Sequence, residues 1–225
     1  TDYIDLYQTH WTSREVPIED SWQAMLRLRE QGKARFVGAC NLGPGDLARV
    51  IAIEPPVTNQ LPYNLLWRMI EAEILPLCRA HEIGVLAYSP LMHGLLAGRY
   101  ASADEVPEGR ARSRHFRSDR GLARHGEAGC ETETFAALEA LRTLSRQTGR
   151  SMADLALAWC GQQPGVASVI AGASTPSQLA ANVTALADPL PAETLHAMSA
   201  ATSELAAALG TTADMWQGTN ASRFR

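Results

Sequence analysis

Apolar residues fall into five short runs along the chain, and segments with helical spacing separate these runs. The runs lie at residues 2–11, 35–40, 57–60, 85–90 and 167–172. Short apolar runs bounded by turn residues predict β-strands. Between them, apolar side chains recur three and four positions apart, as Trp22, Met25 and Leu26 do after the first run. The whole pattern predicts a parallel sheet covered by helices.

Turn and capping residues mark the expected ends of the helices. Ser151, with Asp154 three positions later, and Thr175, which precedes a proline, are typical helix starts. The pattern predicts helices over residues 17–32, 46–51, 69–82, 132–148, after 151, after 175 and over 192–209. Residues 101–130 lack periodicity and predict a long loop, which is a frequent place for function. Six arginines lie in it: Arg110, Arg112, Arg114, Arg117, Arg120 and Arg124.

Two architectures satisfy this order of elements: a doubly wound sheet and a (βα) barrel. No G-x-G-x-x-G follows the first strand, which argues against a doubly wound dinucleotide-binding sheet. An eight-unit barrel needs about 250 residues. The chain has 225 residues, begins at Thr1 rather than Met, and enters a strand pattern at once. Five units in this length resemble most of a barrel whose first strands are absent.

Composition narrows the possible functions. Hydrophobic residues make up 46% of the chain, and the formal net charge is −4. The first value excludes a wholly disordered chain, and the second argues against nucleic-acid binding. No apolar run reaches the ~18 residues of a membrane span, so we expect no membrane partner. The four cysteines are scattered without a C-x-x-C pair, which argues against a metal site and favours a reducing, cytoplasmic location.

Polar residues follow each predicted strand, where the sites of parallel α/β folds gather. These positions hold His10, Asn41, Gln60, Tyr88 and the turn 172–175. They contain no paired carboxylates and no metal-ligand cluster, so glycosidase and metal chemistry are poorly supported. Amides can hold a planar carboxamide, a tyrosine ring can stack on a heteroaromatic face, and a Gly-Ala-Ser-Thr turn before a helix can bind an anion. The set suits a dinucleotide with a nicotinamide head and a phosphate tail.

Five segments together resemble consecutive landmarks of the aldo/keto reductase family. They are DYIDLYQTHW, GKARFVGACN, TNQLPYNLLWR, EILPLCRAHEIGVLAYSPLMHGLLAGRY and VIAGASTPSQLAANV. The resemblance covers essentially the whole chain in order. It implies a (βα)8 TIM barrel that reduces aldehydes and ketones with NADPH and without a metal. On this basis residues 1–225 form a single incomplete barrel domain of strands four to eight, with 101–130 as a variable loop.

The resemblance also implies roles for individual residues. His10 matches the active-site histidine that orients the substrate carbonyl, and Trp11 lines the substrate pocket. Tyr88 matches the ring beneath the nicotinamide, while Asn41 and Gln60 match the groups that hold its carboxamide. Further cofactor contacts are implied along the pyrophosphate-covering loop 89–98 and near the 2′-phosphate and adenine: Ser89, Leu91, Gly94, Leu96, Gly172, Ser174, Gln178 and Asn182.

The catalytic set of the family is incomplete in this sequence. The family's proton donor is a tyrosine made acidic by a lysine and an aspartate, all on the first strands and loops. Lys33 is the only lysine, and we expect it in a helix-to-strand turn at the opposite end of the barrel. Cys40 stands where serine is common, and Ala181 stands where an acidic adenine contact is common, which would loosen cofactor binding.

The same residues also have purely structural explanations. His10 could be a hydrogen-bonded core histidine, and Trp11 could simply pack in the barrel. Asn59 and Gln60 could satisfy backbone groups at a strand end. The resemblance favours functional roles for His10, Gln60 and Tyr88, and it leaves Asn59 open. For the arginine-rich loop we expect a solvated surface; the alternative is that Arg112 or Arg114 folds over the cofactor phosphates.

Two functions from different classes follow. The first is a reductase of small-molecule aldehydes or ketones, in which this chain alone is inactive because the aspartate, tyrosine and lysine are missing. The second is a non-catalytic nucleotide-binding or regulatory module, or a decayed remnant. Both share one physical expectation: the open edges of an incomplete barrel favour self-association.

Overall fold

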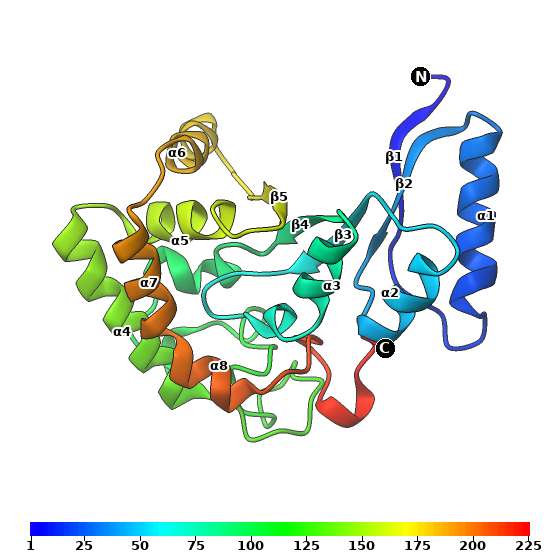
Figure 1. Cartoon of the computed structure of the whole chain (residues 1–225). Coiled ribbons are helices and arrows are strands. Elements are labelled where there is room, and N and C mark those ends of the chain that lie inside the picture. Colours follow the sequence, from blue (N-terminus) through cyan, green and yellow to red (C-terminus); the bar gives the residue numbers. More distant parts are fainter.

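The structure is a computed structural model that describes residues 1–225. Five parallel strands form one sheet in the order β1-β2-β3-β4-β5, so each strand pairs with the next along the chain. The strands are β1 (Ile4–Thr9), β2 (Ala34–Cys40), β3 (Thr58–Pro62), β4 (Gly84–Tyr88) and β5 (Val166–Ile170). This confirms the predicted parallel sheet (Figure 1). β1 and β5 do not pair with each other, so the five strands form an open sheet.

Helices connect the strands as the periodicity predicts. They are α1 (Ile18–Glu30), α2 (Pro44–Ile51), α3 (Ile74–Ala80), α4 (Glu131–Thr148), α5 (Met152–Gly161), α6 (Pro176–Ala187), α7 (Ala192–Ala201) and α8 (Ser203–Leu209). Both predicted N-caps are confirmed. The Ser151 hydroxyl accepts a hydrogen bond from Asp154 N at 3.1 Å, and the Thr175 hydroxyl accepts one from Gln178 N at 3.2 Å.

The helix predicted over residues 69–82 is wrong in its extent. A 3₁₀ turn, η1 (Met69–Glu71), precedes α3, and Glu73 between them has non-helical dihedral angles (φ −137°, ψ −45°). Pro76 explains the break. It lacks an N–H, and its ring would clash with a carbonyl four residues earlier, so a helix that contains it must begin within the preceding turn.

The helix predicted over residues 192–209 is also two helices. α7 ends at Ala201, and the buried Thr202 separates it from α8. The Arg68 guanidinium donates hydrogen bonds to the Ser199 carbonyl at 2.8 Å and to the Thr202 hydroxyl at 3.2 Å. A tertiary contact therefore occupies a carbonyl that a continuous helix would use.

Residues 101–130 form the expected solvated surface only in part, because Arg110, Arg117 and Arg124 are exposed but the centre of the loop is buried. Arg114, His115 and Phe116 are buried within this loop. The Arg114 guanidinium donates to Glu127 at 2.6 Å, to the Leu209 carbonyl at 2.8 Å and to the Thr212 carbonyl at 3.0 Å. These partners occupy Arg114 and tie the loop to the end of α8, so Arg114 cannot cover a ligand phosphate.

The C-terminal segment, residues 213–225, is packed against the sheet rather than free. Asp214 and Met215 are buried in it. The Phe224 ring meets the Trp11 ring edge-on, with centroids 5.5 Å apart. The Arg225 carbonyl accepts a hydrogen bond from Asp46 N, in the first turn of α2, at 2.7 Å. This segment therefore lies over the C-terminal ends of β1 and β2, and the chain ends beside α2 (Figure 1).

Candidate functional site

The parallel register brings the predicted polar residues to one edge of the sheet. Cys40 of β2 pairs with Gln60 of β3, and Tyr88 of β4 pairs with Ile170 of β5. Asn41 comes directly after β2. Residues that are far apart in the sequence therefore meet where the strands end, as the strand-end argument predicts.

Hydrogen bonds connect four of these strand ends. Asn41 Nδ2 donates to the His10 carbonyl at 3.0 Å, and the Tyr88 hydroxyl donates to Asn41 Oδ1 at 3.0 Å. Asn41 N also donates to the Gln60 carbonyl at 2.9 Å. Asn41 is buried and has a φ of +59°, a conformation that asparagine tolerates better than most residues. The network holds the ends of β1, β2, β3 and β4 in a defined arrangement.

Asn59 and Gln60 have different environments although they are adjacent. Asn59 is fully buried; its Oδ1 accepts from Leu42 N at 3.3 Å, and its Nδ2 donates to the Leu42 carbonyl at 3.1 Å. This supports a structural role for Asn59. The Gln60 amide is half-buried and makes no hydrogen bond within the chain. It is therefore free to bind a ligand.

Burial keeps the titratable groups at this edge neutral. It raises the pKa of the Tyr88 phenol well above its ordinary value, and the nearby Asp214 carboxylate acts in the same direction. Burial also raises the pKa of the Cys40 thiol to about 11. At neutral pH Tyr88 is therefore an uncharged donor, and Cys40 is an unreactive thiol.

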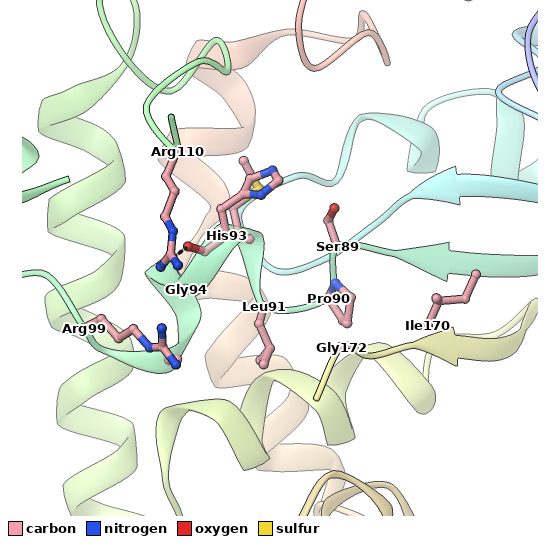
Figure 2. Close-up of a pocket in the computed structure, with 11 residues that line it drawn as sticks. Ser89, Pro90, Leu91, His93, Gly94, Arg99, Arg110, Ile170 and Gly172 are labelled. Carbon is pink, nitrogen blue, oxygen red and sulfur yellow. Dashed lines mark hydrogen bonds between the residues drawn. The ribbon is translucent and has the colours of Figure 1, made fainter. Parts of the chain in front are cut away.

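A cavity of about 470 Å³ opens next to the end of β4 (Figure 2). Four of the predicted cofactor residues line it: Ser89, Leu91, Gly94 and Gly172. Its other lining residues are Pro90, Met92, His93, Ala97, Arg99, Arg110 and Ile170. Leu96 is not among them, and its side chain is fully buried in the core. A cofactor contact of Leu96 stays a prediction.

The backbone that forms this cavity adopts an uncommon conformation. Ser89, Met92 and His93 have positive φ angles of 56°, 41° and 53°, which residues other than glycine rarely adopt. Such strain is concentrated at functional sites in known proteins. Gly94 has a φ of +96°, and a Cβ there would lie 3.3 Å from the Arg110 guanidinium. Glycine therefore leaves room for an arginine beside the turn.

Arg99 and Arg110 give the cavity its positive charge, and our sequence interpretation missed both. They lie on either side of Gly94 in Figure 2. Arg110 donates to the Tyr100 hydroxyl at 2.8 Å, and neither arginine forms an ion pair. Unpaired guanidinium groups at a cavity wall suit phosphate. For Arg110 the available signal was the arginine-rich loop over residues 101–130. Nothing in the sequence distinguished Arg110 from the five other arginines of that loop.

The remaining predicted cofactor residues lie around the start of α6. Ser174 N donates to Gln178 Oε1 at 2.7 Å, and Asn182 Nδ2 donates to the Gly172 carbonyl at 3.3 Å. Ser174 and Gln178 are exposed. Only Gly172 of this group reaches the cavity. Gly172 thus connects this group to the cavity, and Thr175 caps the helix that follows.

The histidine and tryptophan after β1 lie away from this cavity. His10 is exposed, and its ring centroid is 6.3 Å from that of Trp11. Trp11 lines a second cavity of about 300 Å³, together with Arg112, Arg124, Trp216 and Arg223. Arg112 therefore lies in a different cavity from the one with the predicted cofactor residues.

Lys33, the only lysine of the chain, does not lie at the candidate site. Lys33 is exposed at the start of β2, at the opposite end of the sheet from these residues, as predicted. No three His, Cys, Asp or Glu side chains are grouped so that they could hold a metal ion. Among the helices, none combines the length and the apolar character that crossing a membrane requires.

Comparisons with known proteins agree on one protein family. The sequence model of the aldo/keto reductase family matches residues 1–202. An NADH-specific methylglyoxal reductase of Escherichia coli K12 is 34% identical over 189 residues, which cover 82% of this chain and 55% of that protein. A probable voltage-gated potassium channel subunit beta of Oryza sativa is 29% identical over 194 residues, covering 82% and 57%.

A solved structure shows the same arrangement. The glycerol dehydrogenase from Gluconobacter oxydans superposes with a TM-score of 0.75 at 28% identity, covering 91% of this chain and 60% of that protein. The chain thus spans between 55% and 60% of the length of these three proteins.

Proposed function

The chain belongs to the aldo/keto reductase family, and we propose on this basis that it is the cofactor-holding part of a reductase that converts an aldehyde or ketone to an alcohol. In this proposal, β1 to β5 are strands four to eight of a (βα)8 barrel, and residues 1–225 form one domain. The single observation that carries it is the cavity beside Tyr88. Its wall combines four family-matched residues with two unpaired arginines.

The residues at the sheet edge fit a nicotinamide dinucleotide. Gln60 offers a free amide for the carboxamide, and Tyr88 offers a neutral ring for stacking. Asn41 has both ends of its amide engaged, so it orients Tyr88 and retains one N–H for the carboxamide. Arg99, Arg110 and the turn 89–98 would hold the pyrophosphate. When bound, the cofactor supplies the hydride.

The start of α6 would take the adenosine end of the cofactor. Ser174, Gln178 and Asn182 supply polar groups there. We propose NADPH rather than NADH, because Ser174, Gln178 and Asn182 match the family positions near the 2′-phosphate and carry polar groups that can bind it. The methylglyoxal reductase of Escherichia coli is named as NADH-specific. That specificity is a property of that protein, so the preference of this chain for NADPH or NADH has to be measured.

A calorimetric titration tests the cofactor proposal. We expect NADPH to bind the 225-residue chain and to bind more tightly than NADH. Arg110→Gln and Arg99→Gln should each weaken NADPH binding about tenfold, since each removes a charged hydrogen bond. Arg117→Gln is the matched control, because Arg117 lies in the same loop but lines neither cavity. No heat at millimolar NADPH, or equal affinities for all four chains, would contradict the proposal.

Turnover is a separate part of the proposal. In these 225 residues no lysine lies near the sheet edge, because Lys33 is at the other end of the sheet. In this proposal His10 orients a carbonyl, and the tyrosine that protonates it belongs to the earlier barrel strands that the family resemblance implies. General acid catalysis contributes about 10²–10⁴-fold, so we expect this chain alone to reduce carbonyls far more slowly than its relatives. NADPH oxidation with 4-nitrobenzaldehyde at a rate typical of the family would refute this.

A non-catalytic nucleotide-binding module is the second candidate function. The observation that favours it is that Asn41, Gln60 and Tyr88, which suit cofactor binding, lie together at one edge of the sheet. One relative, from Oryza sativa, is named as a probable voltage-gated potassium channel subunit beta and not as a reductase. Turnover by the 225-residue chain would exclude this candidate, whereas NADPH binding without turnover is expected of both candidates.

The exposed edges of the sheet support a proposal about association. Ile4 and Tyr7 of the edge strand β1 are 47% and 41% exposed, and Ile170 of the edge strand β5 is 43% exposed. Exposed apolar groups at the open edges of a sheet favour association with other chains. We propose that the chain self-associates through these edges, and a monomeric mass in light scattering would refute this. The four free cysteines support a cytoplasmic location, which fractionation of cells would test.

A further inference from the structure

The second cavity has an unusual wall. Its five lining residues are Trp11, Arg112, Arg124, Trp216 and Arg223, so they comprise two indole rings and three guanidinium groups. No carboxylate lines it. We call this cavity the arginine pocket. Trp11 directly follows His10, so the pocket lies beside the residue that the proposed function places at the substrate carbonyl.

One of the three arginines is neutralised and forms a rigid part of the wall. Arg223 donates to Asp214 through Nε at 2.8 Å and through Nη2 at 2.9 Å, and the Asp214 side chain is fully buried. The Arg223 guanidinium lies 3.8 Å from the centroid of the Trp11 ring. A guanidinium held in this way stacks on the indole and fixes its face toward the pocket.

The other two arginines have no acidic partner. Arg112 and Arg124 form no ion pair and no hydrogen bond within the chain, and Arg112 Nε is buried without any partner. The Arg112 guanidinium lies 5.4 Å from the centroid of the Trp216 ring, and that ring also contacts His93 at 5.3 Å. Burying part of an unpaired cation costs free energy unless an anion binds there.

We propose that the arginine pocket binds an anionic group, a carboxylate or a phosphate, on the carbonyl substrate. Arg112 and Arg124 hold the anion, and the rings of Trp11 and Trp216 cover the carbon skeleton between the anion and the carbonyl. This inference rests on the proposed function, because that function places the carbonyl near His10. It adds the substrate class, which the family assignment leaves undefined.

The pocket is a property of this chain more than of its family match. Arg112 and Arg124 lie in the loop over residues 101–130. Trp216 and Arg223 lie beyond residue 202, where the match to the family ends. Four of the five lining residues therefore come from a long loop and from the C-terminal segment. Loops and chain ends commonly determine the substrate specificity of a site whose position is set by a rigid sheet.

Calorimetric titration of the 225-residue chain without cofactor tests the proposal. The probes are benzoate, phenyl phosphate and the neutral benzyl alcohol. We expect at least one anion to bind about tenfold more tightly than benzyl alcohol, since hydrogen bonds to charged groups are stronger than neutral ones. The ratio between benzoate and phenyl phosphate distinguishes a carboxylate site from a phosphate site.

Variants connect this affinity to the pocket. Arg112→Gln and Arg124→Gln should each lose most of the preference for the anion, whereas Arg117→Gln should keep it. Equal binding of the anions and benzyl alcohol, or unchanged anion binding in Arg112→Gln and Arg124→Gln, would overturn the proposal. A parallel NADPH titration separates the two proposals. Anion preference without NADPH binding would refute the cofactor proposal alone, and the reverse result would refute the pocket alone.

Discussion

The Tyr88 hydroxyl donates a 3.0 Å hydrogen bond to Asn41 Oδ1 and thereby joins the ends of β4 and β2, which are not neighbours in the sheet. β3 lies between these strands, so the bond crosses above it. Because the same Asn41 amide donates to the His10 carbonyl, the position of the Tyr88 ring is coupled to the end of β1. The Asn41 amide therefore connects the Tyr88 ring, the proposed stacking partner of the nicotinamide, with His10, the proposed active-site histidine.

Removing the Tyr88 hydroxyl should cost stability. Tyr88→Phe leaves the buried Asn41 Oδ1 without this donor, and we expect the free energy of unfolding to fall by about 1–2 kcal/mol. Urea denaturation measures this. The control is Tyr7→Phe, because Tyr7 is exposed and its hydroxyl makes no hydrogen bond. Equal midpoints for the two variants would show that the bond contributes nothing.

The buried Arg114 should be among the most sensitive positions outside the site. Arg114→Met would leave Glu127 and two carbonyl groups without their donor, and we expect a loss of about 2–4 kcal/mol in unfolding free energy. Arg117→Met is the matched control, since Arg117 is exposed and its ion pairs to Asp119 and Glu131 are 3.5 and 3.6 Å long. That variant should change stability by about 0.5 kcal/mol or less. Similar losses in both would contradict the structural role of Arg114.

His115 makes stability depend on pH. Burial lowers its pKa from 6.5 to about 4, and the neutral ring is satisfied by the Leu66 carbonyl at 2.9 Å and the Ser113 hydroxyl at 3.0 Å. As pH falls below 6.5 the unfolded chain takes up a proton at this residue, whereas the folded chain does not until about pH 4. The free energy of unfolding should therefore decrease by about 3 kcal/mol across this window.

Urea unfolding between pH 7 and pH 4 measures this dependence. His115→Gln should reduce its slope by about one proton. Burial also lowers the pKa values of His93 and His125, so part of the slope should remain in His115→Gln. An identical slope in His115→Gln and the native chain would rule out His115 as the source.

Gly43 should control the docking of the C-terminal segment. A Cβ at Gly43 would lie 2.5 Å from the backbone of Phe224 and Arg225, which is closer than atoms can approach. Gly43→Ala should therefore displace the last residues and lower stability by about 1–3 kcal/mol. Tryptic cleavage after Arg223, followed by mass spectrometry, should become faster. Gly109→Ala is the control, because nothing lies within 4 Å of a Cβ there. Equal cleavage rates would show that the segment does not depend on this contact.

Local patterns predicted the elements well. The five strands and the caps at Ser151 and Thr175 follow from residues close in sequence, and these are confirmed. The predicted helices failed where distant residues act. Arg68 binds Ser199 and Thr202 at the end of α7 through hydrogen bonds across more than a hundred residues, and no local pattern encodes such a contact.

The candidate site shows the same division. Parallel strands place their C-terminal ends at one edge, so the sequence alone indicated that Asn41, Gln60 and Tyr88 lie together. It could not separate Asn59 from Gln60, because only the packed structure shows that Leu42 occupies both groups of the Asn59 amide. Nor could it rank the loop arginines, which have the same chemistry and differ only in their neighbours.

The sequence by itself determined which chemistry the strand ends carry, because alternation and capping act over a few residues. Only the tertiary structure decided the charge of the two cavities. It buried Arg114 with Glu127, directed Arg110 toward Gly94, and left Arg112 unpaired beside Trp216. The physical reason is that a guanidinium becomes structural or ligand-binding according to the acceptors within its reach, and folding alone brings those acceptors near.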